Sequence, residues 1–275
     1  MVAAALIVAG ALNVLAAPKQ KNIILATTTS TQDSGLLDVL IPLFEKETGY
    51  FVKTIAVGSG QAMAMGQKGE ADVLLVHSPD AEKKFIEEGY GVNRRLVMHN
   101  DFIIVGPETD PARIKGSKTS SDALKKIALA GALFVSRGDN SGTHAKEKTL
   151  WKKANIVPAG QKWYQETGLG MGQTLNVASE KKGYTLADRG TYLAVKKNLG
   201  LVILVEGDSA LLNIYHVIEV NGGKWPKANS EGARAFADFM VSKKIQEIIK
   251  TFGVDKFGSP LFFPDAGKKV EDLGK

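Results

Sequence analysis

Short apolar runs alternate with segments of helical periodicity along most of the chain. Residues 22–26, 51–57 and 72–76 have the length and composition of buried or half-buried strands. Each run is followed by a turn rich in Gly, Ser or Thr and then by a helix-like segment; between residues 35 and 48, apolar positions recur at helical spacing. This alternation predicts an α/β fold with parallel strands, in which ligands bind beyond the carboxyl ends of the strands.

The pattern restarts after an apolar run at residues 102–107, which ends on Gly-Pro. We expect the chain to cross there, near Gly106, into a second lobe that contains helices near 120–130 and after 142, a glycine-rich turn at 168–172, and the segment 188–199. A return crossing near 206–210 precedes a strand at 211–220 and one long terminal helix at 230–251. The predicted lobe 1 is therefore residues 18–106 with 211–275, and lobe 2 is 107–210. Two crossings between lobes make a hinge.

The first 17 residues carry no charge and end in small side chains before Pro18 and Lys19. Such a run predicts an export signal cleaved near Ala16 or Ala17, because it is short for a membrane span of about 20 residues. No Lys or Arg precedes the apolar run, which leaves an uncleaved membrane anchor as the alternative. The mature protein is expected in the periplasm.

Charge and composition narrow the class of partner. Lys and Arg number 35 against 29 Asp and Glu, a net charge of +6 that is spread along the chain. A nucleic-acid-binding protein would concentrate Arg and aromatic residues in one stripe, which is not found. The absence of Cys excludes disulfides, thiolate metal sites and a lipid-modified cysteine. We expect a monomer without a cofactor.

The stretch 136–144, Ser-Arg-Gly-Asp-Asn-Ser-Gly-Thr-His, follows an apolar run and precedes a helix-like segment. A strand that turns into a helix in this way leaves backbone N–H groups unpaired at the start of the helix, where they favour an anion. Arg137 adds a cation whose planar fork suits an oxyanion, and Asp139 can hold it in place. The alternative is an ordinary capped helix with a surface arginine.

Other motifs point to little chemistry. The turn 168–172, Gly-Leu-Gly-Met-Gly, lacks the spacing of a dinucleotide-binding loop but could supply further amides to a cleft. The four histidines are far apart in the sequence, which disfavours a zinc site. No serine lies in Gly-x-Ser-x-Gly, which disfavours a hydrolase.

Three turns, in this order, resemble the tungstate-binding proteins of ABC importers, the TupA family. They are Thr-Thr-Thr-Ser at 27–30, Gly-Ser-Gly at 58–60, and Ser-Arg-Gly-Asp-Asn-Ser-Gly-Thr at 136–143, and the likeness extends to 71–77 and 183–192. The resemblance implies a type II periplasmic-binding-protein fold that closes on tungstate, or on molybdate as a weaker ligand, and hands it to ABC permease subunits. It implies that the metal is bound only as its oxyanion, by these ligand residues: Thr28, Thr29, Ser59, Arg137, Ser141, Gly142 and Thr143.

Alternatives stay open at this point. Phosphate keeps a proton at neutral pH and calls for a buried carboxylate acceptor, whereas tungstate, molybdate and sulfate are fully ionised and call for donors. Asp80 is the carboxylate near the place where phosphate-binding relatives carry their acceptor, so a phosphate- or sulfate-binding transport protein is the second reading. An enzyme on the same scaffold is a third, disfavoured because the turns supply donors and no evident acid, base or nucleophile.

Overall fold

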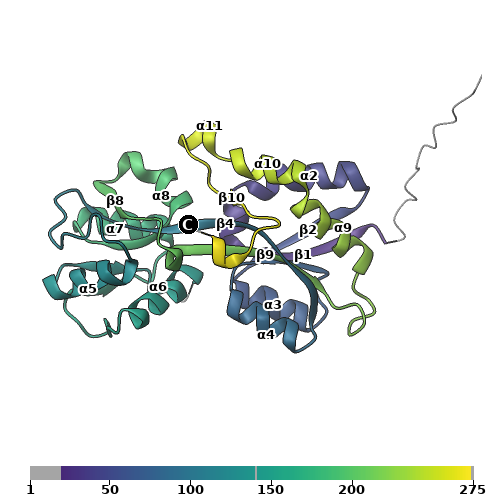
Figure 1. Cartoon of the computed structure of the whole chain (residues 1–275), viewed down its shortest axis with the longest axis horizontal. Helices are drawn as coiled ribbons and strands as arrows, with labels where there is room; N and C mark the ends of the chain where they lie inside the picture. The colour runs from purple at the N-terminus through teal and green to yellow at the C-terminus, as the bar shows by residue number, and fades with distance from the viewer. Residues whose placement is uncertain (1–19, 140, 274–275) are drawn as a thin grey trace, which may run out of the picture.

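The computed structural model describes residues 20–139 and 141–273, so the predicted export signal at 1–17 lies outside the described residues. Figure 1 shows two lobes side by side, joined by strands β4 (Gly91–Pro107) and β9 (Leu212–Val220). We call the lobe that contains the start of the described chain lobe 1 and the other lobe 2. Within the described part, none of the helices has both the length and the apolar composition needed to cross a bilayer.

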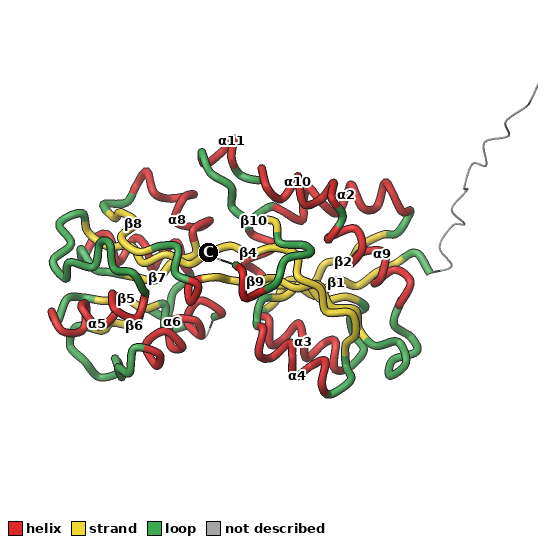
Figure 2. Tube along the Cα trace, viewed as in Figure 1, coloured by secondary structure: helices red, strands yellow, loops and turns green. Residues whose placement is uncertain are grey.

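Lobe 1 is built on a sheet with the strand order β10-β4-β9-β3-β1-β2. The predicted strand–turn–helix units form as expected: β1, β2 and β3 are parallel, and a helix follows each one. Helices α3 and α4 cover one face of the sheet, while α2, α9 and α10 cover the other (Figures 1 and 2). Their bounds are β1 (Asn22–Thr28), α1 (Thr29–Asp33), α2 (Leu36–Thr48), β2 (Phe51–Val57), α3 (Ser59–Gln67), β3 (Val73–Val76) and α4 (Pro79–Glu87).

Strand β4 belongs to both lobes. It pairs antiparallel with β9 up to Asp101 and with β7 from Phe102 onwards, so the predicted strand at 102–107 is only the last part of β4. The passage between lobes thus lies inside the strand, because β4 continues without a break while its partner changes from β9 to β7. The resulting sheet is mixed, where parallel lobes were expected, since the two linking strands run against their neighbours.

Lobe 2 places its helices around a second core. Buried aromatic residues of this core include Phe134, Trp151 and Tyr184, and β5 runs parallel to β6. Its elements are α5 (Ser120–Ala130), β5 (Phe134–Ser136), α6 (Gly142–Lys153), β6 (Tyr164–Glu166), α7 (Met171–Glu180), β7 (Thr185–Asp188), α8 (Arg189–Val195), η1 (Lys196–Asn198), β8 (Leu201–Val205) and η2 (Ser209–Leu211).

The single terminal helix predicted at 230–251 is wrong. Two helices form instead, α9 (Ser230–Val241) and α10 (Lys243–Thr251), because Ser242 has an extended backbone and its side chain accepts a hydrogen bond from the amide of Ile245. A serine oxygen in that position starts a new helix rather than continuing the old one. The chain then passes through α11 (Val254–Phe257), β10 (Phe263–Pro264) and η3 (Val270–Asp272).

Candidate functional site

A cleft of about 520 Å³ lies between the lobes and is lined by residues of both. Helices α1, α3, α6, α7 and α8 all begin at this cleft, so their unpaired first-turn amides and the positive ends of their dipoles gather around it. The structure brings together every ligand residue that the sequence predicted: Thr28, Thr29, Ser59, Arg137, Ser141, Gly142 and Thr143 all line the cleft.

The start of α6 is the lobe 2 side of this site. Ser141 has an extended backbone, and its Oγ accepts from the amide of His144 at 3.3 Å while donating to Asp139 Oδ1 at 2.6 Å. The Ser141 hydroxyl is therefore occupied as a helix cap. The amides of Gly142 and Thr143, in the first turn, have no acceptor within the helix and are the groups that can serve a ligand.

Arg137 is fixed beside these amides. Its Nη2 donates to Asp139 Oδ2 at 2.5 Å and its Nη1 to Thr143 Oγ1 at 3.3 Å. Its Nε is buried and has no hydrogen-bond partner among the described residues. Burial raises the pKa of Asp139, but hydrogen bonds from Ser141 and the charge of Arg137 outweigh it and hold the pKa below its ordinary value. Asp139 is thus ionised at neutral pH, and Arg137 keeps one buried donor without a partner among the described residues.

The predicted ligand residues on the lobe 1 side are neutral. Thr28 is only 3% exposed, and its Oγ1 caps α1 by accepting from the amide of Thr31 at 3.3 Å. Thr29 opens α1 and is exposed. Helix α3 is capped by Gly58 without a side-chain hydrogen bond, and the Oγ of Ser59 is buried with no partner among the described residues. A Cβ added at Gly58 would meet nothing within 4 Å, so a ligand has room to approach this backbone.

Several cleft residues were missed by the sequence reasoning. Asn100 and Asn213 face each other on the linking strands β4 and β9, and the side chain of Asn213 donates to the hydroxyl of Tyr215 at 3.0 Å. Burial raises the pKa of Tyr215, which keeps this hydroxyl protonated. Pairing between strands that are distant in the sequence brings these side chains to the cleft. No local sequence motif identifies them as cleft residues. The other polar cleft residues missed include Ser30, His77, Asp188 and Lys256.

Asp80, the carboxylate that the sequence offered as an acceptor for the proton of phosphate, is not one of the carboxylates that line the cleft. It lies exposed in the first turn of α4. Asp188 does line the cleft, but its Oδ1 caps α8 by accepting from the amide of Thr191 at 2.8 Å. In the glycine-rich turn, Gly170 and Gly172 line the cleft as the start of α7, as the sequence allowed.

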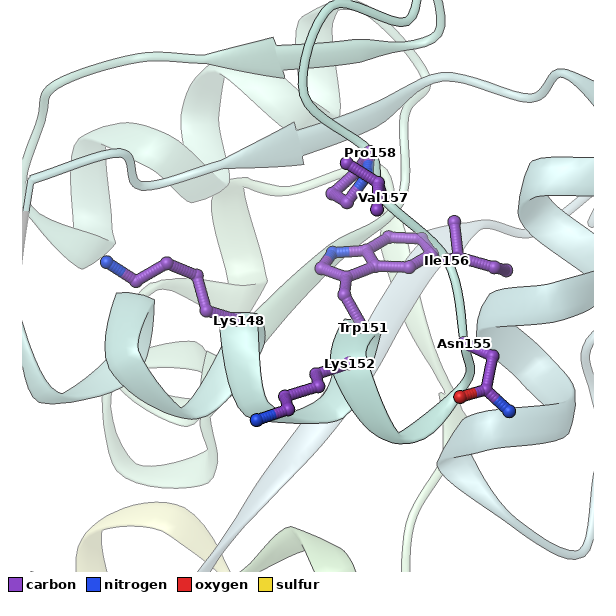
Figure 3. Close-up of a pocket in the computed structure, with 7 residues that line it drawn as sticks. All are labelled: Lys148, Trp151, Lys152, Asn155, Ile156, Val157 and Pro158. Atoms are coloured by element: carbon purple, nitrogen blue, oxygen red, sulfur yellow. The ribbon is translucent and has the colours of Figure 1, made fainter.

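A second cavity, of about 440 Å³, lies at the far end of α6 (Figure 3). Trp151 forms its floor, Val157 and Pro158 lie over the ring, and Lys148 and Lys152 extend away from it. It contains none of the predicted ligand residues. In residues 20–139 and 141–273, no three His, Asp or Glu side chains are grouped so as to hold a metal ion.

Comparisons with known proteins agree with this geometry. Residues 15–244 match the model of the PBP superfamily domain. The tungstate-binding protein TupA of Peptoclostridium acidaminophilum is 53% identical over 90% of this chain and 87% of its own length. The solved structure of TupA from Desulfovibrio alaskensis G20 is 48% identical, with a TM-score of 0.84 over 89% of this chain and 99% of that one. The tungstate ABC transporter structure from Geobacter sulfurreducens is 49% identical, with a TM-score of 0.72 over 83% of this chain and 97% of that one.

Proposed function

The chain belongs to the TupA family of the PBP superfamily, and from that membership we propose that it captures tungstate in the interlobe cleft and delivers it to the membrane subunits of an ABC importer. Molybdate would be a weaker ligand. The proposal agrees with relatives that are named for tungstate binding and for anion binding in ABC transport.

One observation carries this proposal. Three buried polar atoms of cleft residues have no partner among the described residues. Two are donors on opposite lobes, Arg137 Nε and Ser59 Oγ, and the third is the amide oxygen of Asn100 on the linking strand β4. A buried donor left unpaired costs about 1–3 kcal/mol, so a ligand that supplies oxygen acceptors to both is favoured. A tetrahedral oxyanion has such acceptors on every side and can serve both lobes at once.

The charge of the cleft favours an anion that carries no proton. Helix starts, the Gly142 and Thr143 amides and the Arg137 guanidinium all supply donors or positive charge. Two carboxylates at the site, Asp139 and Asp188, already accept hydrogen bonds from protein groups, and a third, Asp33, lines the cleft from an exposed position. Tungstate, molybdate and sulfate therefore fit this donor set better than phosphate does.

Ligand binding would drive closure of the cleft. The donors lie on both lobes, while β4 and β9 join the lobes, so the closed form gains contacts with the anion that the open form lacks. An anion with this differential affinity shifts the population toward the closed form. The closed form is the one that we propose the permease subunits recognise.

Calorimetric titration of the purified protein with tungstate, molybdate, sulfate and phosphate tests the assignment. We expect tungstate to bind most tightly and molybdate next. If sulfate or phosphate binds most tightly, the tungstate assignment is lost.

We also propose that the protein acts in the periplasm, as a monomer and without a catalytic step. Mass spectrometry of a periplasmic fraction should show a chain that begins near Ala17 or Pro18, and light scattering should give the mass of one chain. Recovery of the full-length chain in the membrane fraction would contradict the export proposal. Bound oxyanion should be recovered chemically unchanged.

A further inference from the structure

His77 contacts several parts of the cleft at once. It follows β3, and its Nε2 lies 3.2 Å from Thr28 Oγ1 and 3.4 Å from Ser30 Oγ on the lobe 1 side. Its ring lies 4.7 Å, centroid to centroid, from the ring of Tyr215 on the linking strand β9, and it hydrogen-bonds the side chain of Asn213 on the same strand. The imidazole is thus held from two directions in one orientation.

Lobe 2 meets the same ring. A methyl group added at Gly142, the first residue of α6, would lie 3.5 Å from His77 Cε1, an ordinary van der Waals distance. The space between the imidazole and the start of α6 therefore has room for little more than one methyl group. Gly142 and Thr143 carry the first-turn amides that we assign to the oxyanion. If lobe 2 moved further toward lobe 1, the start of α6 would collide with the imidazole of His77.

The imidazole acts here through its bulk rather than its charge. Enclosure of the ring lowers the pKa of His77 to about 4, so it is neutral at the pH of the periplasm. A neutral ring adds no cation to the anion site. Its fixed contacts on β9 and α1 leave it unable to turn aside when the lobes approach.

We propose that His77 is the spacer that sets the closest approach of the lobes and thereby selects large tetrahedral dianions over sulfate. This inference rests on the proposed function. Sulfate has the charge and shape of tungstate, but its bonds from the central atom to oxygen are shorter. With the lobes held apart, sulfate cannot reach the short hydrogen-bond distances, about 2.7–3.2 Å, on both sides at once. Tungstate and molybdate are nearly equal in size, so the spacer does not separate those two.

The test compares two substitutions of the same residue by titration with tungstate and with sulfate. His77→Asn removes the ring, and the ratio of sulfate affinity to tungstate affinity should rise by on the order of tenfold, the range that small steric differences in a pocket produce. His77→Phe keeps the ring and loses the hydrogen bonds to Thr28 and Ser30. The affinities of His77→Phe for tungstate and for sulfate should both fall, and the ratio between them should stay close to that of the wild type.

Two glycines of lobe 2 provide a matched control. Gly142→Ala adds its methyl group against His77 and should weaken sulfate more than tungstate. Gly200 lies outside the cleft, and Gly200→Ala adds a methyl group at an ordinary van der Waals distance, 3.6 Å from Ser179 Oγ, so the ratio should not change. Thermal melting followed by circular dichroism confirms that each variant is folded.

The outcomes are distinct. An unchanged ratio in His77→Asn, or an equal change in His77→Asn and His77→Phe, overturns the spacer and makes His77 a hydrogen-bonding residue. If Gly142→Ala and Gly200→Ala behave alike, the contact between His77 and α6 does not set the closed state. A wild-type protein that fails to bind tungstate overturns the proposed function itself, which the first titration reveals before any variant is compared.

Discussion

The two sides of the cleft offer their hydrogen-bond donors in different ways. On lobe 2, Arg137, Asp139 and Ser141 are already bonded to one another, so a charged group is held in place before a ligand arrives. On lobe 1, the predicted ligand residues are neutral, and the Ser59 hydroxyl has no partner within the described residues. The comparison suggests that lobe 2 contributes a preorganised charge and that lobe 1 contributes donors that are satisfied only by the ligand. Preorganised charge is the larger contribution to binding an anion.

The largest expected effect is on folding stability, which should depend on pH differently for the two sides of the cleft. His77, at the lobe 1 side, has a pKa of about 4 against an ordinary value of 6.5, because burial outweighs the favourable charge of Glu82. The unfolded chain therefore binds this proton first, and stability is lost as the pH falls from 6.5 toward 4. The loss approaches about 3 kcal/mol, at about 1.4 kcal/mol per pH unit. Asp139, at the lobe 2 side, has a lowered pKa, so its contribution is lost only as the pH falls below its ordinary value of 3.8.

Chemical denaturation of the ligand-free protein at a series of pH values measures this difference. His77→Gln should flatten the slope between pH 6.5 and 4, whereas Asp139→Asn should leave that slope as it is. His144 also has a pKa lowered by burial, so His144→Gln is the control for the contribution of lobe 2 in the same window. A slope that His77→Gln leaves intact would show that the imidazole is not held neutral.

The next effect concerns the charge on lobe 2. A hydrogen bond from a charged group contributes about 1.5–3 kcal/mol, so Arg137→Gln should weaken tungstate binding by on the order of ten- to a hundredfold. Arg137→Lys keeps the charge but loses the planar fork, and its affinity should lie between the two. Calorimetric titration measures both. Tungstate binding by Arg137→Gln that equals the wild type, together with a loss in Ser59→Ala, would place the main contribution on lobe 1 and reverse the comparison.

A smaller effect is expected at Ser59. Its hydroxyl has no protein partner in the described structure, so Ser59→Ala should leave the melting temperature unchanged. The hydrogen bond to the ligand is lost, and tungstate affinity should fall by about two- to tenfold, which corresponds to about 0.5–1.5 kcal/mol for a neutral donor. Differential scanning calorimetry with and without tungstate gives both quantities. A drop in the melting temperature of the ligand-free protein would show that the hydroxyl is structural.

The smallest effect on affinity is expected at Ser141. In contrast to Ser59, its hydroxyl should contribute more to folding stability than to binding. Its hydroxyl caps α6, so Ser141→Ala should destabilise the ligand-free protein by about 1 kcal/mol. Tungstate affinity should fall less than in Ser59→Ala, because the amides of Gly142 and Thr143 remain. If Ser141→Ala costs more affinity than Ser59→Ala, the Ser141 hydroxyl leaves its cap to bind the anion.

Local chemistry in the sequence determined the elements of the site. The turns at 27–30, 58–60 and 136–143 each follow an apolar strand and open a helix in the sequence pattern, and the structure forms these strands and helices in the residues that it describes. Each is encoded within about ten residues, by apolar period, glycine and hydroxyl caps, which is why the pattern could predict them. The resemblance to the TupA family then joined these turns into one predicted site, and all seven predicted residues line one cleft.

Only the tertiary structure decided which atoms are left for a ligand. The hydroxyls of Thr28 and Ser141 became helix caps, whereas Ser59 Oγ and Arg137 Nε stayed without partners in the described residues. His77 lies beside Gly142 and Asn213 because the segment after β3, the start of α6 and strand β9 all line the same cleft. These contacts depend on strand pairing and on packing between the lobes, which bring together residues far apart in the chain. Neither produces a recognisable pattern in the local sequence around these residues, so the sequence alone did not predict the contacts.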